Sequence, residues 1–184
     1  TLRYFRRMIG LRGIQLELNT RVDAAMIAAG HYDEVVVATG IEPRRPDIPG
    51  LDHRKVVPYV DAILGRKPIG RSVAIIGAGG IGFDVAELVS HAGPSAALDV
   101  DVFAKEWGID FAHHPRGGVT GVKPEVARAN RTVYLLQRKP EAPGRSLGRT
   151  TGWTHRMTLG RRGVQMISGV EYLKIDNAGL HARV

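Results

Sequence analysis

One short segment of this chain limits its fold more than any other. It reads Gly77-Ala-Gly-Gly-Ile-Gly82, directly after the apolar run Val73–Ile76 and at the start of a helical pattern over residues 81–91. A strand, a glycine turn and a helix in this order begin a dinucleotide-binding α/β unit. The first glycine permits the tight turn, the second permits close approach to a pyrophosphate, and the third permits close packing of helix on strand. The alternative is a structural turn without a ligand.

The rest of the chain also has the pattern of an α/β fold. Apolar residues at helical spacing predict helices over residues 2–10, 59–64 and 153–161. Alternation of apolar and polar residues predicts a strand over residues 14–18. Short apolar runs predict strands over residues 34–40, 73–76, 132–137 and 164–167, with a terminal hairpin around Asn177–Gly179. Residues 92–131 are predicted to be an irregular insertion with a short helix near Lys105. We therefore expect a Rossmann-like, three-layer α/β domain with a parallel sheet flanked by helices.

A proline-rich segment divides the chain. Residues 41–50 read Ile-Glu-Pro-Arg-Arg-Pro-Asp-Ile-Pro-Gly and contain three prolines. Such a sequence suits an extended crossing between two lobes better than a helix or a strand. We place the first domain boundary here.

The preferred nucleotide depends on which segment forms the second strand. An acidic residue at the end of that strand would bind a ribose 2′-hydroxyl and indicate NAD, whereas a basic residue would accommodate a 2′-phosphate. Residues 99–103, Asp-Val-Asp-Val-Phe, lie about 20 residues past the glycines and would indicate NAD. Two carboxylates do not suit a buried parallel strand, and the apolar run Thr132–Gln137 fits better. Arg138 and Lys139 would then favour NADP(H), unless both are solvated surface cations.

Composition excludes several function classes. The chain has 184 residues and no cysteine, which removes disulfides and cysteine-ligated zinc or iron–sulfur sites from it. The formal net charge of +8 makes a nucleic-acid-binding module the strongest competing class. Basic pairs such as Arg44-Arg45 and Arg161-Arg162 are scattered, however, so we expect no nucleic-acid partner. His113 and His114 have no matching carboxylates nearby, and we expect no metal site.

The sequence also bears on where in the cell the protein is found. No stretch approaches the ~20 apolar residues of a membrane span, and residues 1–7 lack the apolar core of a signal peptide. We expect a soluble, cytoplasmic protein without membrane contact. Both ends interrupt predicted elements, so we also expect a piece of a longer polypeptide.

Six segments, in chain order, carry a resemblance to a known family. They are Thr1–Ile9, Val37–Gly40, Val73–Asp84, Glu106–Asp110, Leu136–Lys139 and Leu147–Arg156. Many nucleotide-binding proteins share the glycine fingerprint, whereas Glu106–Asp110 and the Thr150–Trp153 loop are far more specific. Together, over nearly the whole chain, these segments resemble bacterial NADPH-dependent 2,4-dienoyl-CoA reductases.

The resemblance implies a multidomain flavoenzyme of fatty acid beta-oxidation. In that family NADPH reduces FAD, and electrons pass through a 4Fe-4S cluster to FMN and then to a dienoyl thioester. It implies that residues 1–50 are a partial FAD-domain segment with its linker, and that residues 51–184 are the NADP(H)-binding domain with an insertion at about 92–131. The FMN barrel, the cluster cysteines and the opening glycine motif of the FAD domain have no counterpart here. The partner would be the rest of the same polypeptide, and we do not expect this piece to be active alone.

The resemblance also assigns cofactor-binding positions, and no catalytic side chain. These are Gly77, Ala78, Gly79, Gly80, Ile81 and Gly82 in the glycine turn, Arg138 and Lys139 at the 2′-phosphate, and Thr39 and Gly40 at a strand end that faces FAD. Trp153 and His155 either line the gap between nicotinamide and flavin or are a core anchor and a surface residue. The chain would orient the nicotinamide for hydride transfer to FAD. A related alternative is an amine-dehydrogenase-type domain that binds a nucleotide without NADPH turnover.

Overall fold

The computed structural model describes residues 1–112 and 121–184. It divides into two units, residues 1–44 and residues 45–184. The assignment of residues 1–50 to a FAD domain and of residues 51–184 to an NADP(H) domain stays a prediction.

A parallel three-stranded sheet forms the centre of the second unit. Its strands are β1 (Ser72–Ile76), β2 (Thr132–Leu136) and β3 (Gln165–Ile167), in the order β1-β2-β3. The β1–β2 register pairs the first residue of each strand and also the last, Ile76 with Leu136. Both strands therefore end at the same edge of the sheet.

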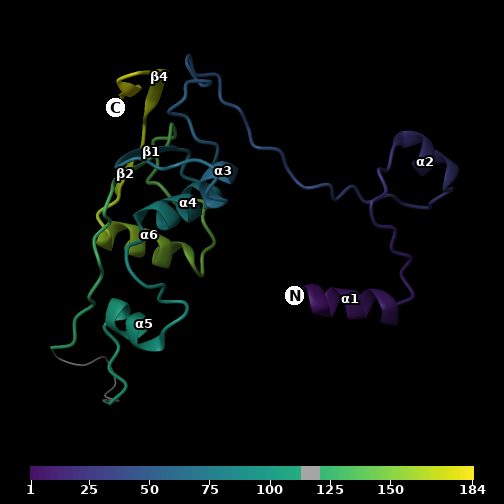
Figure 1. Ribbon diagram of the computed structural model, residues 1–184, viewed down its shortest axis with the longest axis horizontal. Helices are drawn as coiled ribbons and strands as arrows, with labels where there is room; N and C mark the ends of the chain where they lie inside the picture. The colour runs from purple at the N-terminus through teal and green to yellow at the C-terminus, as the bar shows by residue number, and fades with distance from the viewer. Residues whose placement is uncertain (113–120) are drawn as a thin grey trace. The chain divides into compact units, whose positions relative to one another are not determined.

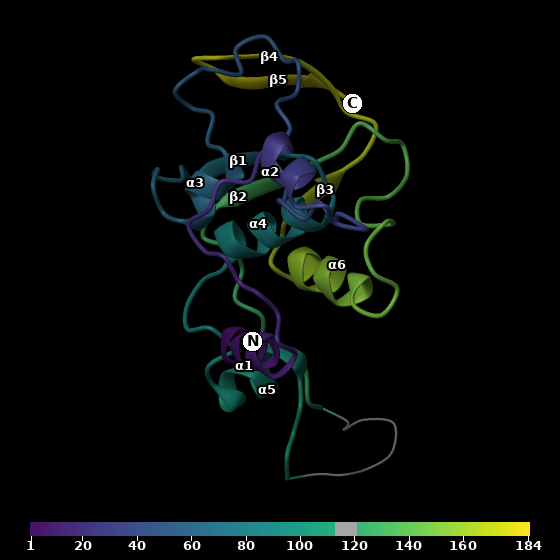
Figure 2. The ribbon, with the colours of Figure 1, turned by 90° about the vertical axis from the view of Figure 1, so that its right-hand side faces the viewer.

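Within the second unit, helices α3 (Tyr59–Ile63), α4 (Gly80–Ser90) and α6 (Gly152–Arg161) lie on one side of this sheet and a hairpin lies on the other (Figures 1 and 2). Helix α4 contacts β1, β2 and helix α6, and helix α3 packs against α4. The hairpin consists of the antiparallel strands β4 (Glu171–Asp176) and β5 (Gly179–Arg183). The predicted α/β class with a parallel sheet flanked by helices is confirmed.

The core lies between the sheet and its helices, because that is where the apolar faces meet. Phe83 of α4, Leu135 of β2 and Leu159 of α6 are each at most 1% exposed. All three belong to one cluster of buried side chains. The glycine turn and the segment after β2 thus extend from a packed core.

The insertion contains helix α5 (Val100–Trp107). The Asp99 side chain caps this helix by accepting hydrogen bonds from the N–H groups of Asp101 and Val102 at 2.9 and 3.1 Å. A second strand over residues 99–103 is therefore excluded, and the short helix predicted near Lys105 is confirmed. β2 is the second parallel strand, as the apolar run predicted.

The second half of the proline-rich segment packs onto the hairpin. Ile48 is 6% exposed, and the Pro49 carbonyl accepts a hydrogen bond from the Ile175 N–H at 2.8 Å. A Cβ on Gly50, whose φ is +85°, would lie 2.0 Å from the Ile175 carbonyl oxygen. Residues 45–50 are thus part of the second unit.

The first unit contains helices α1 (Leu2–Leu11) and α2 (Ala24–Ala29). All residues from 1 to 44 are described, and none of them is buried. The predicted strands over residues 14–18 and 34–40 are wrong, since neither segment has a neighbouring strand to bond with. Val36 and Val37 are accordingly 86% and 77% exposed.

Helix α2 has a capping signal in the sequence. Asp23 Oδ1 accepts a hydrogen bond from the Met26 N–H at 2.9 Å, which is a side-chain N-cap before an alanine-rich run. None of the described helices has the length and apolar composition needed to cross a lipid bilayer.

Candidate functional site

Two glycines of the turn are required by contacts within the chain. Gly77 has a φ of +109°, and its N–H donates to the Leu136 carbonyl of β2 at 2.8 Å. A Cβ on Gly82 would lie 1.8 Å from the Gly77 carbonyl oxygen. Gly77 is thus needed for the turn, and Gly82 for the close approach of α4.

Gly79 and Gly80 are different, because nothing in the protein fills the space beside them. A Cβ added at either position would have no protein atom within 4 Å. Gly79 is the N-cap of the 11-residue helix α4, and no side chain in the described part of the chain caps it. The first N–H groups of the helix and its partial positive charge are therefore available to an anion. Of the two non-glycine positions in the turn, Ala78 is buried and Ile81 is 42% exposed.

Arg138 and Lys139 lie at the same edge of the sheet as this turn. They follow β2, whose last residue pairs with the last residue of β1, and both are exposed. Burial raises the pKa of the Tyr172 phenol, and the Arg138 guanidinium opposes part of that increase. The structure thus places Gly77–Gly82 and the two cations at the same edge of the sheet, and their role in nucleotide binding stays a prediction.

The loop after these cations packs over the first turns of α4. A Cβ on Gly144, whose φ is +80°, would lie 2.6 Å from Phe83 Cζ. The Gly144 carbonyl accepts a hydrogen bond from Arg156 Nη1 of α6 at 2.9 Å. This loop thus joins α6 to the helix that starts at the glycine turn.

Trp153 and His155, for which the sequence left two roles open, both have specific partners in the structure. His155 Nδ1 lies 2.6 Å from Glu87 Oε1, so His155 links α6 to α4. Trp153 is 50% exposed, and its Nε1–H donates to the Thr150 carbonyl at 3.0 Å. The Trp153 ring also lies edge-on to Trp107 of α5, with 6.5 Å between the ring centroids. His155 is thus not a free surface residue, and Trp153 is not a buried anchor.

The remaining predicted positions lie in the first unit or outside the described residues. Thr39 and Gly40 belong to the first unit, where the strand expected to present them is absent. Their role toward FAD stays a prediction. His113 and His114 lie outside the described residues, and the described residues contain no cluster of three or more potential metal ligands.

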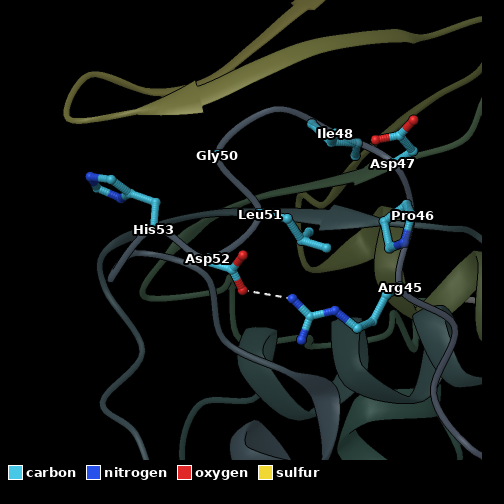
Figure 3. Close-up of a pocket in the computed structure, with 8 residues that line it drawn as sticks. All are labelled: Arg45, Pro46, Asp47, Ile48, Gly50, Leu51, Asp52 and His53. Atoms are coloured by element: carbon cyan, nitrogen blue, oxygen red, sulfur yellow. Dashed lines mark hydrogen bonds and ion pairs between the residues drawn. The ribbon is translucent and has the colours of Figure 1, made fainter.

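A separate surface hollow of about 470 Å³ is lined by residues between Arg45 and His53 (Figure 3). Arg45 Nη2 lies 2.6 Å from Asp52 Oδ1, and these side chains are 72% and 90% exposed. His53 Nε2 lies 3.1 Å from Asn177 Oδ1 in the hairpin turn. The ionisable groups that line the hollow are exposed or already have a partner. None of the predicted site residues lines the hollow.

Sequence reasoning missed the Gln137 side chain, directly after β2, and the Tyr172 side chain in the hairpin. The Gln137 amide contacts two carbonyls of the segment that carries Arg138 and Lys139. The Tyr172 hydroxyl is buried without a hydrogen-bond partner among the described residues. Gln137 was visible as the polar end of an apolar strand, but its acceptors are backbone atoms, which no residue pattern reveals.

Comparisons with known proteins show which proteins this chain is similar to. The chain is 31% identical over 85 residues to a metal reductase of Desulforamulus reducens and 34% identical over 86 residues to a cinnamate reductase of Clostridium sporogenes. These matches cover 44% and 47% of the chain and 13% of each relative, so the chain spans a small part of their length.

Two solved structures share the fold. A 2-naphthoyl-CoA reductase in complex with 2-naphthoyl-CoA matches 98% of this chain and 22% of its own, with a TM-score of 0.63 and 23% identity. A 6-hydroxypseudooxynicotine amine oxidase from Pseudomonas geniculata matches 91% of this chain and 21% of its own, with a TM-score of 0.55 and 17% identity. The family model described as pyridine nucleotide-disulphide oxidoreductase matches residues 15–183, and the chain therefore belongs to this family of nucleotide- and flavin-binding oxidoreductase domains.

Proposed function

We propose that residues 45–184 bind NADP(H) and that this chain is the nucleotide-binding part of a larger flavin-dependent reductase. One observation carries the proposal. The parallel register of β1 and β2 brings the open, uncapped start of α4 and two exposed cations to one edge of the sheet. An anion-binding helix terminus beside a basic pair suits a dinucleotide with a 2′-phosphate.

The glycine turn leaves open space where such a ligand would bind. The N–H groups at the start of α4 would hold the diphosphate, and Gly79 and Gly80 leave room for it. Arg138 and Lys139 would pair with the 2′-phosphate. Bound NADPH supplies a hydride, and the chain's own contribution is to bind and orient the nucleotide.

For the whole enzyme, we propose electron transfer from NADPH through a flavin to an unsaturated acyl substrate. The sequence resemblance to 2,4-dienoyl-CoA reductases and the relatives named as reductases support this. A 4Fe-4S cluster would be held by other parts of the polypeptide, because this chain has no cysteine to ligate it. We propose that FAD and FMN are also held largely by other parts. Thr39 and Gly40 are this chain's proposed FAD-side positions.

The nucleotide assignment can be tested by calorimetric titration of the 184-residue chain with NADP⁺ and with NAD⁺. We expect NADP⁺ to bind at least roughly tenfold more tightly, because charge-assisted contacts to a phosphate are lost with NAD⁺. Arg138→Glu should remove this preference, whereas Arg128→Glu, an exposed charge reversal before β2, should keep it. Equal affinity for the two nucleotides would disprove the 2′-phosphate assignment. Binding of neither nucleotide, together with salt-sensitive binding to a DNA duplex, would support the nucleic-acid alternative.

The role in the larger enzyme needs a separate experiment. In the complete protein, NADPH added without oxygen should bleach the flavin absorbance, and the Arg138→Glu variant should require a higher NADPH concentration. An unchanged flavin spectrum despite NADPH binding would instead support a nucleotide-binding domain without NADPH turnover.

A further inference from the structure

The segment that carries the two cations is held by hydrogen bonds from one side chain and one backbone N–H. Gln137 Nε2 donates to the Lys139 carbonyl at 3.2 Å and also to the Glu141 carbonyl. The Gly169 N–H donates to the same Lys139 carbonyl at 3.0 Å. Residues 137–141 are thus curled around the Gln137 amide and tied to the start of the hairpin.

The identity of the Gln137 donor follows from its partners. Both acceptors are backbone carbonyl oxygens, which cannot donate, so the group that faces them is the NH₂ and not the amide oxygen. One NH₂ has two hydrogens, which match the two carbonyls. Replacement of this NH₂ by an oxygen or a methyl group would remove both bonds.

The Gln137 backbone is anchored independently of its side chain. Its N–H donates to the Ile167 carbonyl, and its carbonyl accepts from the Val170 N–H, both at 3.0 Å. A substitution of the side chain therefore leaves residue 137 in the sheet. What changes is the path of the next few residues, which include Arg138 and Lys139.

We propose that Gln137 is a positioning residue for nucleotide specificity, which holds the Arg138–Glu141 segment in the conformation that presents both cations beside the glycine turn. This inference rests on the proposed NADP(H) function. Two adjacent cations repel each other, and a mobile backbone would let them separate into solvent. A segment fixed before binding loses less conformational freedom when the phosphate arrives. Gln137 would thus favour the 2′-phosphate without contacting it.

The test compares Gln137→Met with the wild-type 184-residue chain. Methionine has a similar length and no donor. The matched control is Gln165→Met on the neighbouring strand β3, where the glutamine side chain is exposed. Affinities for NADP⁺, NAD⁺, 2′,5′-ADP and ADP are measured by calorimetry, and the exchange of the backbone N–H groups of residues 138–141 by NMR.

In Gln137→Met, we expect the affinities for NADP⁺ and 2′,5′-ADP to fall roughly fivefold to tenfold, as loss of two hydrogen bonds suggests. Affinities for NAD⁺ and ADP should change less than twofold, and exchange at residues 138–141 should become faster. Gln137→Glu, which replaces the NH₂ by an oxygen that repels both carbonyls, should act in the same direction and more strongly. Gln165→Met should change none of these values.

The outcomes separate this inference from the proposed function. If the wild-type chain does not prefer NADP⁺ over NAD⁺, the proposed 2′-phosphate site is wrong and this inference is wrong with it. If the wild type prefers NADP⁺ and both Gln137 variants keep the full preference, only the role of Gln137 is disproved. An equal loss of affinity for all four ligands would show a general structural role, and would also overturn it.

Discussion

At the scale of single residues, the glycine turn contains two kinds of glycine. The backbone requires glycine at positions 77 and 82. Gly77 has a φ of +109°, and a Cβ on Gly82 would lie 1.8 Å from the Gly77 carbonyl oxygen. Gly79 and Gly80 meet no protein atom, so stability alone does not require them to be glycine. Substitution can therefore separate the contribution of the turn to folding from its contribution to binding.

Gly82→Ala should destabilise the protein. The added Cβ would collide with the Gly77 carbonyl, so α4 must move away from β1 and β2, at a cost of about 3 kcal/mol. Urea unfolding followed by circular dichroism measures this loss. A change of less than about 0.5 kcal/mol would show that α4 does not approach the turn as closely as the structure indicates.

Gly80→Ala should leave the stability of the protein nearly unchanged and weaken its binding of NADP⁺. Its Cβ meets no protein atom, and alanine is the better helix former, so the free energy of unfolding should stay within about 1 kcal/mol of the wild type. The methyl group would occupy space that we assign to the diphosphate, so NADP⁺ affinity should fall in calorimetric titration. Wild-type affinity in a folded Gly80→Ala chain would contradict the placement of the diphosphate at the start of α4.

At the scale of elements, the sequence predicted well what depends on local pattern. The run Thr132–Gln137 was correctly preferred over residues 99–103, because two carboxylates do not suit a buried parallel strand. The same apolar criterion failed over residues 34–40, since a strand also needs a neighbour to bond with and the first unit offers none. Pattern thus identifies segments that can form strands, and tertiary pairing decides whether they do.

The candidate site shows the same division. The glycine turn and the two cations could be predicted, because each follows a strand at a recognisable position. The Gln137 amide could not, because its acceptors are two backbone carbonyls whose position depends on the path of the loop. Nor could the pairing of His155 with Glu87, since it depends on how α6 packs against α4.

The hydrogen bond between α4 and α6 can be measured by a double-mutant cycle. Glu87 and His155 are about one-third exposed and their atoms lie 2.6 Å apart, so we expect a coupling of about 1 kcal/mol between Glu87→Ala and His155→Ala. The control is the exposed pair Glu171–Arg183 at 2.9 Å, for which we expect less than about 0.5 kcal/mol. Equal coupling in the two pairs would mean that the bond between the helices stabilises no more than a surface contact.

The hairpin makes a pH-dependent contribution to the stability of the protein, and the direction of this pH dependence can be predicted. A hydrogen bond from His181 at 2.9 Å, followed by the ammonium of Lys174 at 3.0 Å, holds the pKa of Asp176 well below its ordinary value of 3.8. The stabilisation by the carboxylate is therefore complete above pH 3.8 and is lost as the pH falls toward the folded-state pKa. Asp176→Asn should be less stable than the wild type near neutral pH, and the difference should shrink in urea unfolding at progressively lower pH. A difference that stays constant with pH would exclude this carboxylate as its source.

At the scale of the whole molecule, the two units differ in whether they have a buried core. The second unit has a core that includes Phe83, Leu135 and Leu159, whereas no residue of the first unit is buried. Burial of apolar surface is the main source of stability, so the cooperative unfolding of this chain should come from residues 45–184.

Removal of residues 1–44 tests this contrast directly. The shortened chain should unfold at the same temperature as the 184-residue chain, within a few degrees, and should bind NADP⁺ with unchanged affinity, since all proposed contacts with the nucleotide lie in the second unit. Scanning calorimetry and calorimetric titration measure both quantities, with hydrogen exchange of residues 34–40 in the longer chain as an internal control. Fast exchange there would agree with an unpaired segment. A large fall in unfolding temperature or in affinity after the truncation would show that the first unit stabilises the nucleotide-binding unit, and that Val36 and Val37 have a partner within this chain.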